Sequence, residues 1–376
     1  MKRFFPLILA VCLLFSLSAC RKKPKDPVDN TTSGNAQNQT GTNQTDDDGV
    51  LVAVSLPTVT NDTRHADGTV LFQHTFQNMS LVLHRPEVAD KIILDFLNRV
   101  DSTAESANAT MEMAKGAYNG SGNWTPYLYH ITYSPTRIDH EVLSLFGNNV
   151  VFSGAGHPER TCVSASYDLL TGDVLTLASI MDKDATMQQF LNLVLDGLTE
   201  MAEGDYLYEN YKDTVFNRFF DSNPAYDEYW YFTQTGLCFY FAPYEIAPYS
   251  SGVITVEIPY EKLKNIIHED YIPAARNSST GKVTVTPFNQ ANLNSFSHIA
   301  ELVTEKEGNM YMLHTDGTVQ DIRIILSNKA SNCTVFAAHS LVPGNGIMIQ
   351  GNDDTLKNMK VTYKSGKDIV TMPVIG

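Results

Sequence analysis

A carboxylate stands between aromatic residues in the segment Tyr244-Glu245-Ile246-Ala247-Pro248-Tyr249. Such a group can bind a sugar or a basic side chain, because the rings offer rigid contact area and the carboxylate accepts hydrogen bonds. Tyr244, Glu245 and Tyr249 are therefore predicted ligand-binding residues. The structural alternative is that Pro243 and Pro248 stiffen a loop in which Glu245 hydrogen-bonds backbone amides and the tyrosines pack.

The same glutamate could serve as a glycosidase acid, but that chemistry needs a second carboxylate at a defined distance. Asp227 and Glu228 are close to it in sequence only, and together with Trp230 they are predicted to bind ligand. They belong to a stretch that indicates an acidic, aromatic face, suited to a basic protein or to a glycan. Its aromatic members are Tyr206, Tyr208, Tyr211, Tyr226, Tyr229, Trp230 and Tyr231, and its acids are Asp205, Glu209, Asp213, Asp221, Asp227 and Glu228.

No motif in the sequence predicts catalysis, a metal site or a cofactor. The ten histidines lack zinc-site spacing, and neither a Gly-x-Ser-x-Gly elbow nor a phosphate-binding glycine loop occurs. His157 lies in a Gly/Pro turn near Glu159, where a general base is one interpretation and a turn-capping histidine is the other. We therefore predict no catalytic residue, no metal and no cofactor, and a protein that is not an enzyme.

The first twenty residues predict a lipid anchor at Cys20. Lys2 and Arg3 precede an apolar run that has the length of a signal-peptide core and is too short to span a bilayer. The run ends in Leu17-Ser18-Ala19-Cys20, which resembles the bacterial lipobox, where the thiol is acylated and the chain is cleaved before it. Palmitate or a similar acyl chain would hold the protein at the outer face of the cytoplasmic membrane. An ordinary secretory signal with an incidental cysteine is the alternative.

Three further cysteines lie beyond the anchor, namely Cys162, Cys238 and Cys333. None forms a Cys-x-x-Cys pair or has metal-site spacing. Cys162 and Cys238 alternate with apolar neighbours in strand-like runs, which predicts buried free thiols. A Cys162–Cys238 disulfide remains the open alternative.

The composition suits a packed extracytoplasmic protein. Hydrophobic residues make up 43% of the chain and charged residues 18%, which favours a folded core over disorder. The formal net charge of -15 argues against nucleic acid as a partner, since phosphates need a basic face. The charge permits a basic partner drawn by long-range attraction, with solubility alone as the alternative explanation.

Composition and hydrophobic pattern divide the chain into six segments. A basic cluster and an Asn/Gln/Thr/Gly-rich stretch follow Cys20 and predict a disordered tether beside the lipid. The predicted segments are a lipoprotein signal peptide 1–19, the tether 20–49, an α+β domain 50–155, a second α+β domain 156–270, a linker 271–282 and a small all-β domain 283–376.

The expected fold class is α+β, with antiparallel sheet backed by helices in the two central units and an all-β unit, a small sandwich or barrel, at the C-terminus. Apolar residues at three- and four-residue steps predict helices over Pro86–Lys115, Asp184–Glu203 and Tyr208–Phe220. Gln234-Thr235-Gly236 predicts the turn of a hairpin.

Four stretches resemble one family of extracytoplasmic domains. They are Gly154-Ala155-Gly156-His157-Pro158, the run Tyr167-Asp168-Leu169-Leu170-Thr171-Gly172-Asp173-Val174-Leu175-Thr176-Leu177, the run from Leu237 to Tyr249, and Val256-Glu257-Ile258-Pro259-Tyr260. Together they resemble the RsiV-like C-terminal domain of a lysozyme-sensing anti-sigma factor. Residues 50–155 resemble, less specifically, the PdaC/RsiV-like domain that precedes it, and a related arrangement accompanies some peptidoglycan deacetylases.

The resemblance implies an α+β sheet backed by helices, an extracytoplasmic binding or sensing role and no catalytic residues. In the lysozyme sensor this region binds lysozyme. The resemblance does not extend to residues 280–376. We therefore expect a membrane-anchored lipoprotein that binds or senses lysozyme, another basic wall-active protein or a peptidoglycan-related glycan. A cell-wall enzyme of unfamiliar type and a structural envelope lipoprotein are the alternatives.

Overall fold

The computed structural model describes residues 51–120, 122–154, 156–201, 206–220, 229–274, 280–327 and 332–375. All of them lie in the compact unit Asp46–Gly376. The predicted signal peptide, the predicted lipidation site Cys20 and the predicted tether lie outside the described residues, as do Asp227 and Glu228. Among the described residues, no helix is long and apolar enough to cross a membrane.

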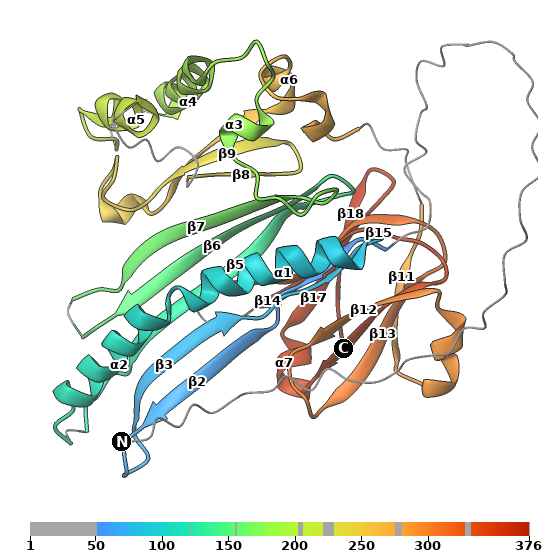
Figure 1. The fold of residues 1–376 in the computed structure, drawn as a ribbon. Helices are drawn as coiled ribbons and strands as arrows, with labels where there is room; N and C mark the ends of the chain where they lie inside the picture. The colour runs from blue at the N-terminus through green and yellow to red at the C-terminus, as the bar shows by residue number, and fades with distance from the viewer. Residues whose placement is uncertain are drawn as a thin grey trace, which may run out of the picture. The chain divides into compact units, whose positions relative to one another are not determined.

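The first sheet has five strands in the order β2-β3-β5-β6-β7 and is antiparallel except for the parallel pair β3 and β5. Polar strand β2 was not expected from the sequence, because its residues carry no apolar alternation. Helices α1 and α2 lie across one face of the sheet (Figure 1). The strands are β2 Thr58–Arg64, β3 Val70–Gln77, β5 Tyr127–Ile138, β6 Val142–Phe152 and β7 Glu159–Asp168.

The helix expected over Pro86–Lys115 is two helices, α1 Pro86–Asp101 and α2 Ala104–Ala117. Ser102 Oγ donates to the Arg99 carbonyl (2.7 Å), and Thr103 Oγ1 donates to the Val100 carbonyl (2.7 Å). The two hydroxyls thus hydrogen-bond to carbonyls at the end of α1. Such side-chain hydrogen bonds compete with the backbone hydrogen bonds that would continue the helix. Apolar residues of α1, Ile92 and Phe96 among them, pack into the core beneath it.

A second sheet of three antiparallel strands lies between the first sheet and a pair of helices. The hairpin predicted about Gln234-Thr235-Gly236 is confirmed, and the sheet order is β10-β9-β8. One face packs on α4 and α5 through a large apolar core, and the other places Tyr231 and Tyr240 against Phe146 of β6. The elements are α3 Leu177–Ile180, α4 Met187–Met201, α5 Tyr211–Phe220, β8 Trp230–Phe232, β9 Gly236–Phe241, β10 Ile254–Pro259 and α6 Tyr260–Leu263.

The C-terminal strands form two sheets that share one apolar core, a sandwich rather than a barrel. Their orders are β18-β17-β14-β15-β1-β4 and β11-β13-β16-β12, and β12 pairs with β16 in parallel. The C-terminal strands are β11 Val283–Pro287, β12 His298–Val303, β13 Asn309–Thr315, β14 Val319–Ser327, β15 Asn332–Leu341, β16 Asn345–Gly351, β17 Met359–Ser365 and β18 Asp368–Pro373, with a short helix α7 Asp353–Lys357. The α+β fold class predicted from the sequence is confirmed.

Two strands from the N-terminal part of the chain complete the larger C-terminal sheet. Strand β1 (Ala53–Ser55) pairs antiparallel with both β15 and β4 (Ser80–Val82), so that Ala53 lies opposite Ala338. Leu51 and Ala53 are buried in the C-terminal core. Residues that the sequence assigned to different segments therefore share one sheet, and the domain boundaries given above stay a prediction.

Two histidines in the first sheet have buried ring nitrogens. Nε2 of His74 on β3 and Nε2 of His130 on β5 have no hydrogen-bond partner among the described residues. Burial lowers the pKa of both side chains, and the nearby charge of His74 lowers the pKa of His130 further. The fold thus favours neutral imidazoles at these two positions.

The three cysteines of the folded part are free thiols. Cys238 is buried, and Cys162 packs against the same small cluster of aromatic residues between the two sheets. Burial raises the pKa of each of these two thiols to about 11.

Candidate functional site

The turn after β9 carries a tyrosine in a strained backbone conformation. Tyr244 has φ 72°, in the left-handed region that favours glycine. Two backbone hydrogen bonds hold the turn, from Tyr244 N to the Ala247 carbonyl (3.1 Å) and from Glu245 N to the Ala242 carbonyl (3.1 Å). A residue kept in this region costs on the order of 1–3 kcal/mol, so the surroundings must hold the turn in place.

Glu245 contributes much of the stabilisation that keeps this turn in place. Its Oε2 accepts a hydrogen bond from the Ala242 backbone N (2.9 Å), and its Oε1 forms an ion pair with Nη2 of Arg218 on α5. The side chain of Arg218 is only 4% exposed and that of Glu245 is 24% exposed. The glutamate therefore closes the turn and anchors it to α5, and both of its oxygens are engaged.

Arg218 is a buried cation enclosed by aromatic rings. Its guanidinium carbon lies 3.8 Å from the ring centroid of Tyr229 and 4.3 Å from that of Phe241, and Nη1 donates to the Tyr240 carbonyl (2.7 Å). Burial lowers the pKa of Arg218 to about 10, so the side chain is charged at neutral pH. Removal of the glutamate would leave this charge without its partner in a poorly solvated place.

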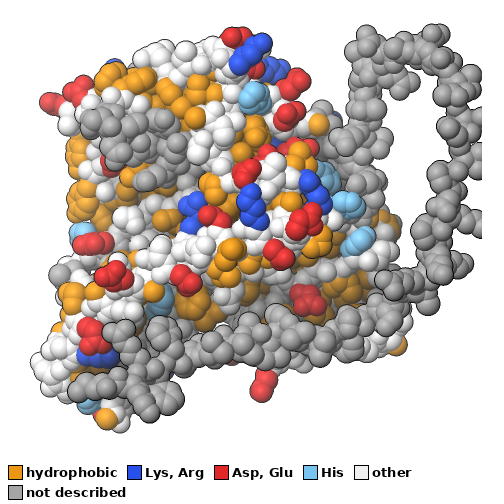
Figure 2. Space-filling view, in the orientation of Figure 1, with side chains coloured by type: hydrophobic (Ala, Val, Ile, Leu, Met, Phe, Trp, Pro, Cys, Tyr) orange, Lys and Arg blue, Asp and Glu red, His pale blue; other side chains and the backbone are white. Residues whose placement is uncertain are grey.

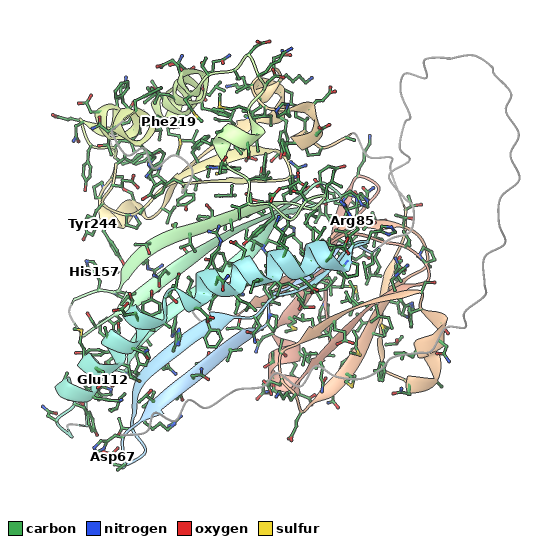
Figure 3. All side chains as sticks on the ribbon, viewed as in Figure 1. Asp67, Arg85, Glu112, His157, Phe219 and Tyr244 are labelled. Atoms are coloured by element: carbon green, nitrogen blue, oxygen red, sulfur yellow. The ribbon has the colours of Figure 1, made fainter. Side chains whose placement is uncertain are left out.

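The strained turn displays an aromatic cluster on the surface, made of His157, Tyr244 and Tyr249. The rings of His157 and Tyr249 stack with centroids 4.2 Å apart, and the rings of Tyr244 and Tyr249 lie 5.4 Å apart. Tyr244 is 58% exposed, His157 is exposed and Tyr249 is half-buried. Figure 3 shows His157, from the turn before β7, and Tyr244 pointing toward one another.

Hydrogen bonds fix the geometry of this cluster. Tyr249 Oη donates to the Pro158 carbonyl (2.9 Å). His157 Nδ1 lies 3.2 Å from the same carbonyl, and its Nε2 lies 3.2 Å from Tyr244 Oη. A neutral imidazole satisfies both contacts if Nδ1–H donates to the carbonyl and Nε2 accepts from the tyrosine. The cluster is thus a preorganised aromatic surface rather than three independent side chains.

The structure brings together only some of the predicted site residues. Tyr244, Glu245 and Tyr249 meet at the turn, but Glu245 faces inward to Arg218. Trp230 is 2% exposed and packs in the core, so it does not belong to an exposed face. His157 joins the cluster across a long stretch of chain, and no sequence signal links its Gly/Pro turn to Tyr244.

The acidic, aromatic face expected around Trp230 is interior only in part where the structure describes it, since Tyr206, Tyr208 and Tyr229 are half-buried. Tyr211 and Tyr231 are buried with Trp230, whereas the acids Glu209 and Asp213 are exposed on α5 and the turn before it. Tyrosine is common on strands because its ring packs well against neighbouring side chains. This holds whether the strand is half-buried or lies in a core. On the face seen in Figure 2, acidic and basic side chains are interspersed along α1.

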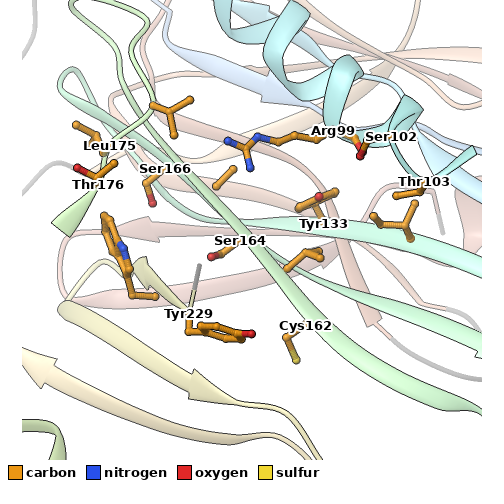
Figure 4. Close-up of a pocket in the computed structure, with 15 residues that line it drawn as sticks. Arg99, Ser102, Thr103, Tyr133, Cys162, Ser164, Ser166, Leu175, Thr176 and Tyr229 are labelled. Atoms are coloured by element: carbon orange, nitrogen blue, oxygen red, sulfur yellow. The ribbon is translucent and has the colours of Figure 1, made fainter. Parts of the chain in front are cut away.

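A separate cavity of about 460 Å³ lies where the end of α1, strand β7 and the start of β8 meet (Figure 4). Arg99 and Tyr133 line it from one side of β7, and Tyr229 and Trp230 line it from the other. The indole Nε1 of Trp230 is buried without a hydrogen-bond partner in the described part of the chain. An unpaired buried donor costs about 1–3 kcal/mol.

No group of three or more histidine, cysteine or carboxylate side chains that could hold a metal gathers among the described residues. The described site therefore consists of aromatic rings, one buried ion pair and a cavity with hydrogen-bond donors. Such an arrangement can bind a ligand by stacking and hydrogen bonding.

Residues 179–261 match the family described as "Protein of unknown function (DUF3298)". The chain thus contains a DUF3298 domain, which includes α4, α5, the hairpin β8–β9, strand β10, the Arg218–Glu245 pair and both tyrosines of the aromatic cluster. None of the curated proteins matches this chain.

Two solved structures of DUF3298 proteins are similar to this chain. A family member from Bacteroides fragilis has 16% identity and a TM-score of 0.44, with 59% of this chain and 95% of that chain covered. A family protein from Pseudomonas aeruginosa has 14% identity and a TM-score of 0.43, with 59% of this chain and 97% of that chain covered.

Proposed function

We propose that this chain is a lipoprotein, acylated at Cys20 and held at the outer face of a bacterial cytoplasmic membrane, that binds a basic protein acting on the cell wall. Lysozyme is the ligand to test first. The observation that carries the proposal is the exposed aromatic cluster of His157, Tyr244 and Tyr249 on a strained turn.

Rigid aromatic surface is what protein-binding sites use, because tyrosine offers large contact area and loses little conformational entropy on binding. The cluster gains rigidity from the Arg218–Glu245 pair beneath it and from the hydrogen bonds to the Pro158 carbonyl. A strained residue kept at the surface is consistent with a constraint from function.

A basic ligand suits the charge of the protein. The formal net charge of -15 attracts a cationic partner over long range, and the exposed acids Glu209 and Asp213 lie in the same DUF3298 domain as the cluster. The resemblance of residues 156–270 to the RsiV-like C-terminal domain, and of residues 50–155 to a PdaC/RsiV-like domain, supports lysozyme as that partner.

We propose binding rather than catalysis. The carboxylate between the tyrosines would need to reach a substrate to act as an acid, but its oxygens are engaged by Arg218 and by the Ala242 amide. The described aromatic cluster holds hydroxyls and one imidazole, which suit recognition.

The test is a calorimetric titration of residues 20–376 carrying Cys20→Ser with a basic c-type lysozyme at low and at moderate salt. Tyr244→Ala and Tyr249→Ala should each weaken binding at least tenfold, about 1.4 kcal/mol. Ile369→Ala, which removes an exposed apolar side chain from β18, is the matched control and should leave the affinity unchanged.

Stoichiometric binding that survives moderate salt and depends on the two tyrosines supports the proposal. Binding that disappears with salt would mean only that opposite charges meet, and would contradict it. Equal affinities for the tyrosine variants and the parent would place any lysozyme contact elsewhere.

A further inference from the structure

The smaller sheet of the C-terminal sandwich, which includes β11, β12 and β13 in Figure 1, carries thioethers and an imidazole on its outer face. The inward side chains of β13 and β16 pack in the C-terminal core and are Tyr311, Leu313, Ile347 and Ile349. Residues alternate between the two faces of a strand, so the outward side chains include those of Met310, Met312, His314 and Met348. Sheets with one face on a core usually place polar side chains on the other face.

Three of these side chains are close enough to share one ion. Met312 and Met348 are direct partners in the antiparallel pair of β13 and β16, which places their Cβ atoms about 5 Å apart. His314 follows Met312 on the same face, roughly 7 Å further along β13. Methionine side chains are long and flexible, so the two sulfurs can turn toward the imidazole. Exposed Glu301 of β12 pairs with Met348 and adds a carboxylate to this face.

Met312 and His314 line the same cavity, which has a volume of about 430 Å³. Phe296 forms part of its wall, and the Phe296 ring centroid lies 6.3 Å from that of His314. A Cβ atom at Gly346 would lie 2.7 Å from Met312 Sδ and 3.0 Å from Phe296 Cδ1. Because Leu313 pairs with Ile347, Gly346 is the residue of β16 beside His314. The sulfur and the aromatic ring therefore lie together next to the imidazole.

Backbone hydrogen bonds hold the segment that walls this cavity. Phe288 N donates to the Met310 carbonyl (2.8 Å), and Ser297 N donates to the Gly344 carbonyl (2.6 Å). The chain between these two points forms the short 3-10 helix Gln290–Ser295. The cavity is thus preformed, and Met312 and Met348 on its sheet are only 4% and 9% exposed.

The donor set is that of a soft metal ion. Thioether sulfur selects monovalent copper, whereas magnesium and calcium prefer oxygen ligands, and histidine is the commonest metal ligand in proteins. Methionine also fills gaps in cores, but these methionines lie outside the C-terminal core and in line with a histidine. The sequence search for metal sites rested on the spacing of histidines and cysteines, which this arrangement does not use.

We propose that the outer face of the small sheet binds Cu(I), with Met312 Sδ and an imidazole nitrogen of His314 as ligands and Met348 Sδ as the third. Phe296 shields the ion from water, and its ring face attracts a cation. Binding involves no change in the oxidation state of the copper.

The test uses residues 20–376 with Cys20→Ser and carbon-13 in the methionine methyl groups, read by nuclear magnetic resonance. The probes are Cu(I), kept reduced with ascorbate, and Ag(I), a soft ion of the same charge that is stable in air. Single Met→Leu variants assign the methyl signals. Because the small sheet contains no cysteine, an ion bound at Cys162, Cys238 or Cys333 leaves the signals of Met312 and Met348 in place.

We expect the methyl signals of Met312 and Met348 to shift together and to saturate with either ion. The signal of Met113, which is 54% exposed on α2, should stay in place, and Zn(II) should move none of the three. In a chain whose remaining cysteines are replaced by alanine, His314→Gln should weaken Ag(I) binding at least tenfold. His298→Gln, at an exposed histidine of β12, is the matched control and should leave the affinity unchanged.

Unshifted signals of Met312 and Met348 would overturn the proposal, as would a Met113 shift of the same size at the same Ag(I) concentration. Equal shifts with Zn(II) would also overturn it, because they would not come from thioether ligands. The methyl signals of the chain that keeps its three thiols decide the question even if a variant fails to fold. They do not depend on lysozyme, so failure of the proposed function leaves this test unaffected.

Discussion

Arg218 on α5 and Glu245 in the turn after β9 form an ion pair between a nearly fully buried cation and a largely buried carboxylate. The pair connects two features of the DUF3298 domain. Glu245 holds the turn that displays Tyr244, and Arg218 lies against the Tyr229 ring at the cavity wall. Removal of either partner should therefore lower the free energy of unfolding more than removal of an exposed charged side chain does.

Glu245→Ala should lower the free energy of unfolding by about 3 kcal/mol, because it leaves the Arg218 charge buried without a partner. Urea unfolding followed by circular dichroism measures this change. Glu307→Ala, at an exposed glutamate, is the control and should leave stability nearly unchanged. A loss at Glu245 no larger than the loss at Glu307 would contradict the structural role of the pair.

The backbone strain at Tyr244 can be separated from the function of its ring. Tyr244→Ala and Tyr244→Gly both remove the ring, but only glycine adopts φ 72° without steric cost. The glycine variant should therefore be more stable than the alanine variant by about 1 kcal/mol. Both should lose lysozyme affinity to the same extent. Equal stability of the two variants would show that this turn relaxes once the ring is gone.

Stability should depend on pH through His74 and His130. Their pKa values lie below 6.5 in the folded protein, so the unfolded chain takes up more protons as the pH falls. The neutral rings favour the fold above about pH 6.5, and this contribution is lost as the pH falls below it toward the lowered values. His130→Gln should flatten the difference between urea midpoints at about pH 7.5 and about pH 5.5. His298→Gln, at an exposed position, should leave that difference as in the parent.

The thiols should be unreactive until the protein unfolds. With a pKa of about 11, the thiols of Cys162 and Cys238 are each ionised in roughly one molecule in a thousand at about pH 8. A thiol reagent should label them slowly in the native protein. After unfolding without reductant, residues 20–376 with Cys20→Ser should present all three thiols. A single reactive thiol would instead reveal the Cys162–Cys238 disulfide.

The proposed acylation at Cys20 predicts how the chain behaves in cells. A bacterium that expresses the full chain and is fed a labelled palmitate analogue should incorporate the label, and Cys20→Ser should remove it and release the protein from the membrane fraction. Cys12→Ser, inside the predicted signal peptide, is the control and should keep the label. Label that persists in the Cys20 variant would exclude this residue as the anchor.

The sequence determined most of the regular elements, since their signals are local. The hairpin β8–β9 follows from a glycine turn between two apolar runs, and the strands from β13 to β18 follow from short apolar runs bounded by turn residues. Where local signals conflict or are weak, prediction failed. Polar β2 has no apolar alternation, and Ser102 and Thr103 end a helix that the apolar periodicity would have continued.

The candidate site depended on contacts between distant residues. Sequence alone placed Tyr244, Glu245 and Tyr249 in one segment, but it could not decide which side chain faces outward. The tertiary structure turned Glu245 toward Arg218, buried Trp230 at the cavity wall and placed His157 on Tyr249. It also placed β1 beside β15, which joins the two ends of the folded chain. Local patterns encode helix, strand and turn, whereas exposure and pairing depend on which surfaces the whole chain buries together.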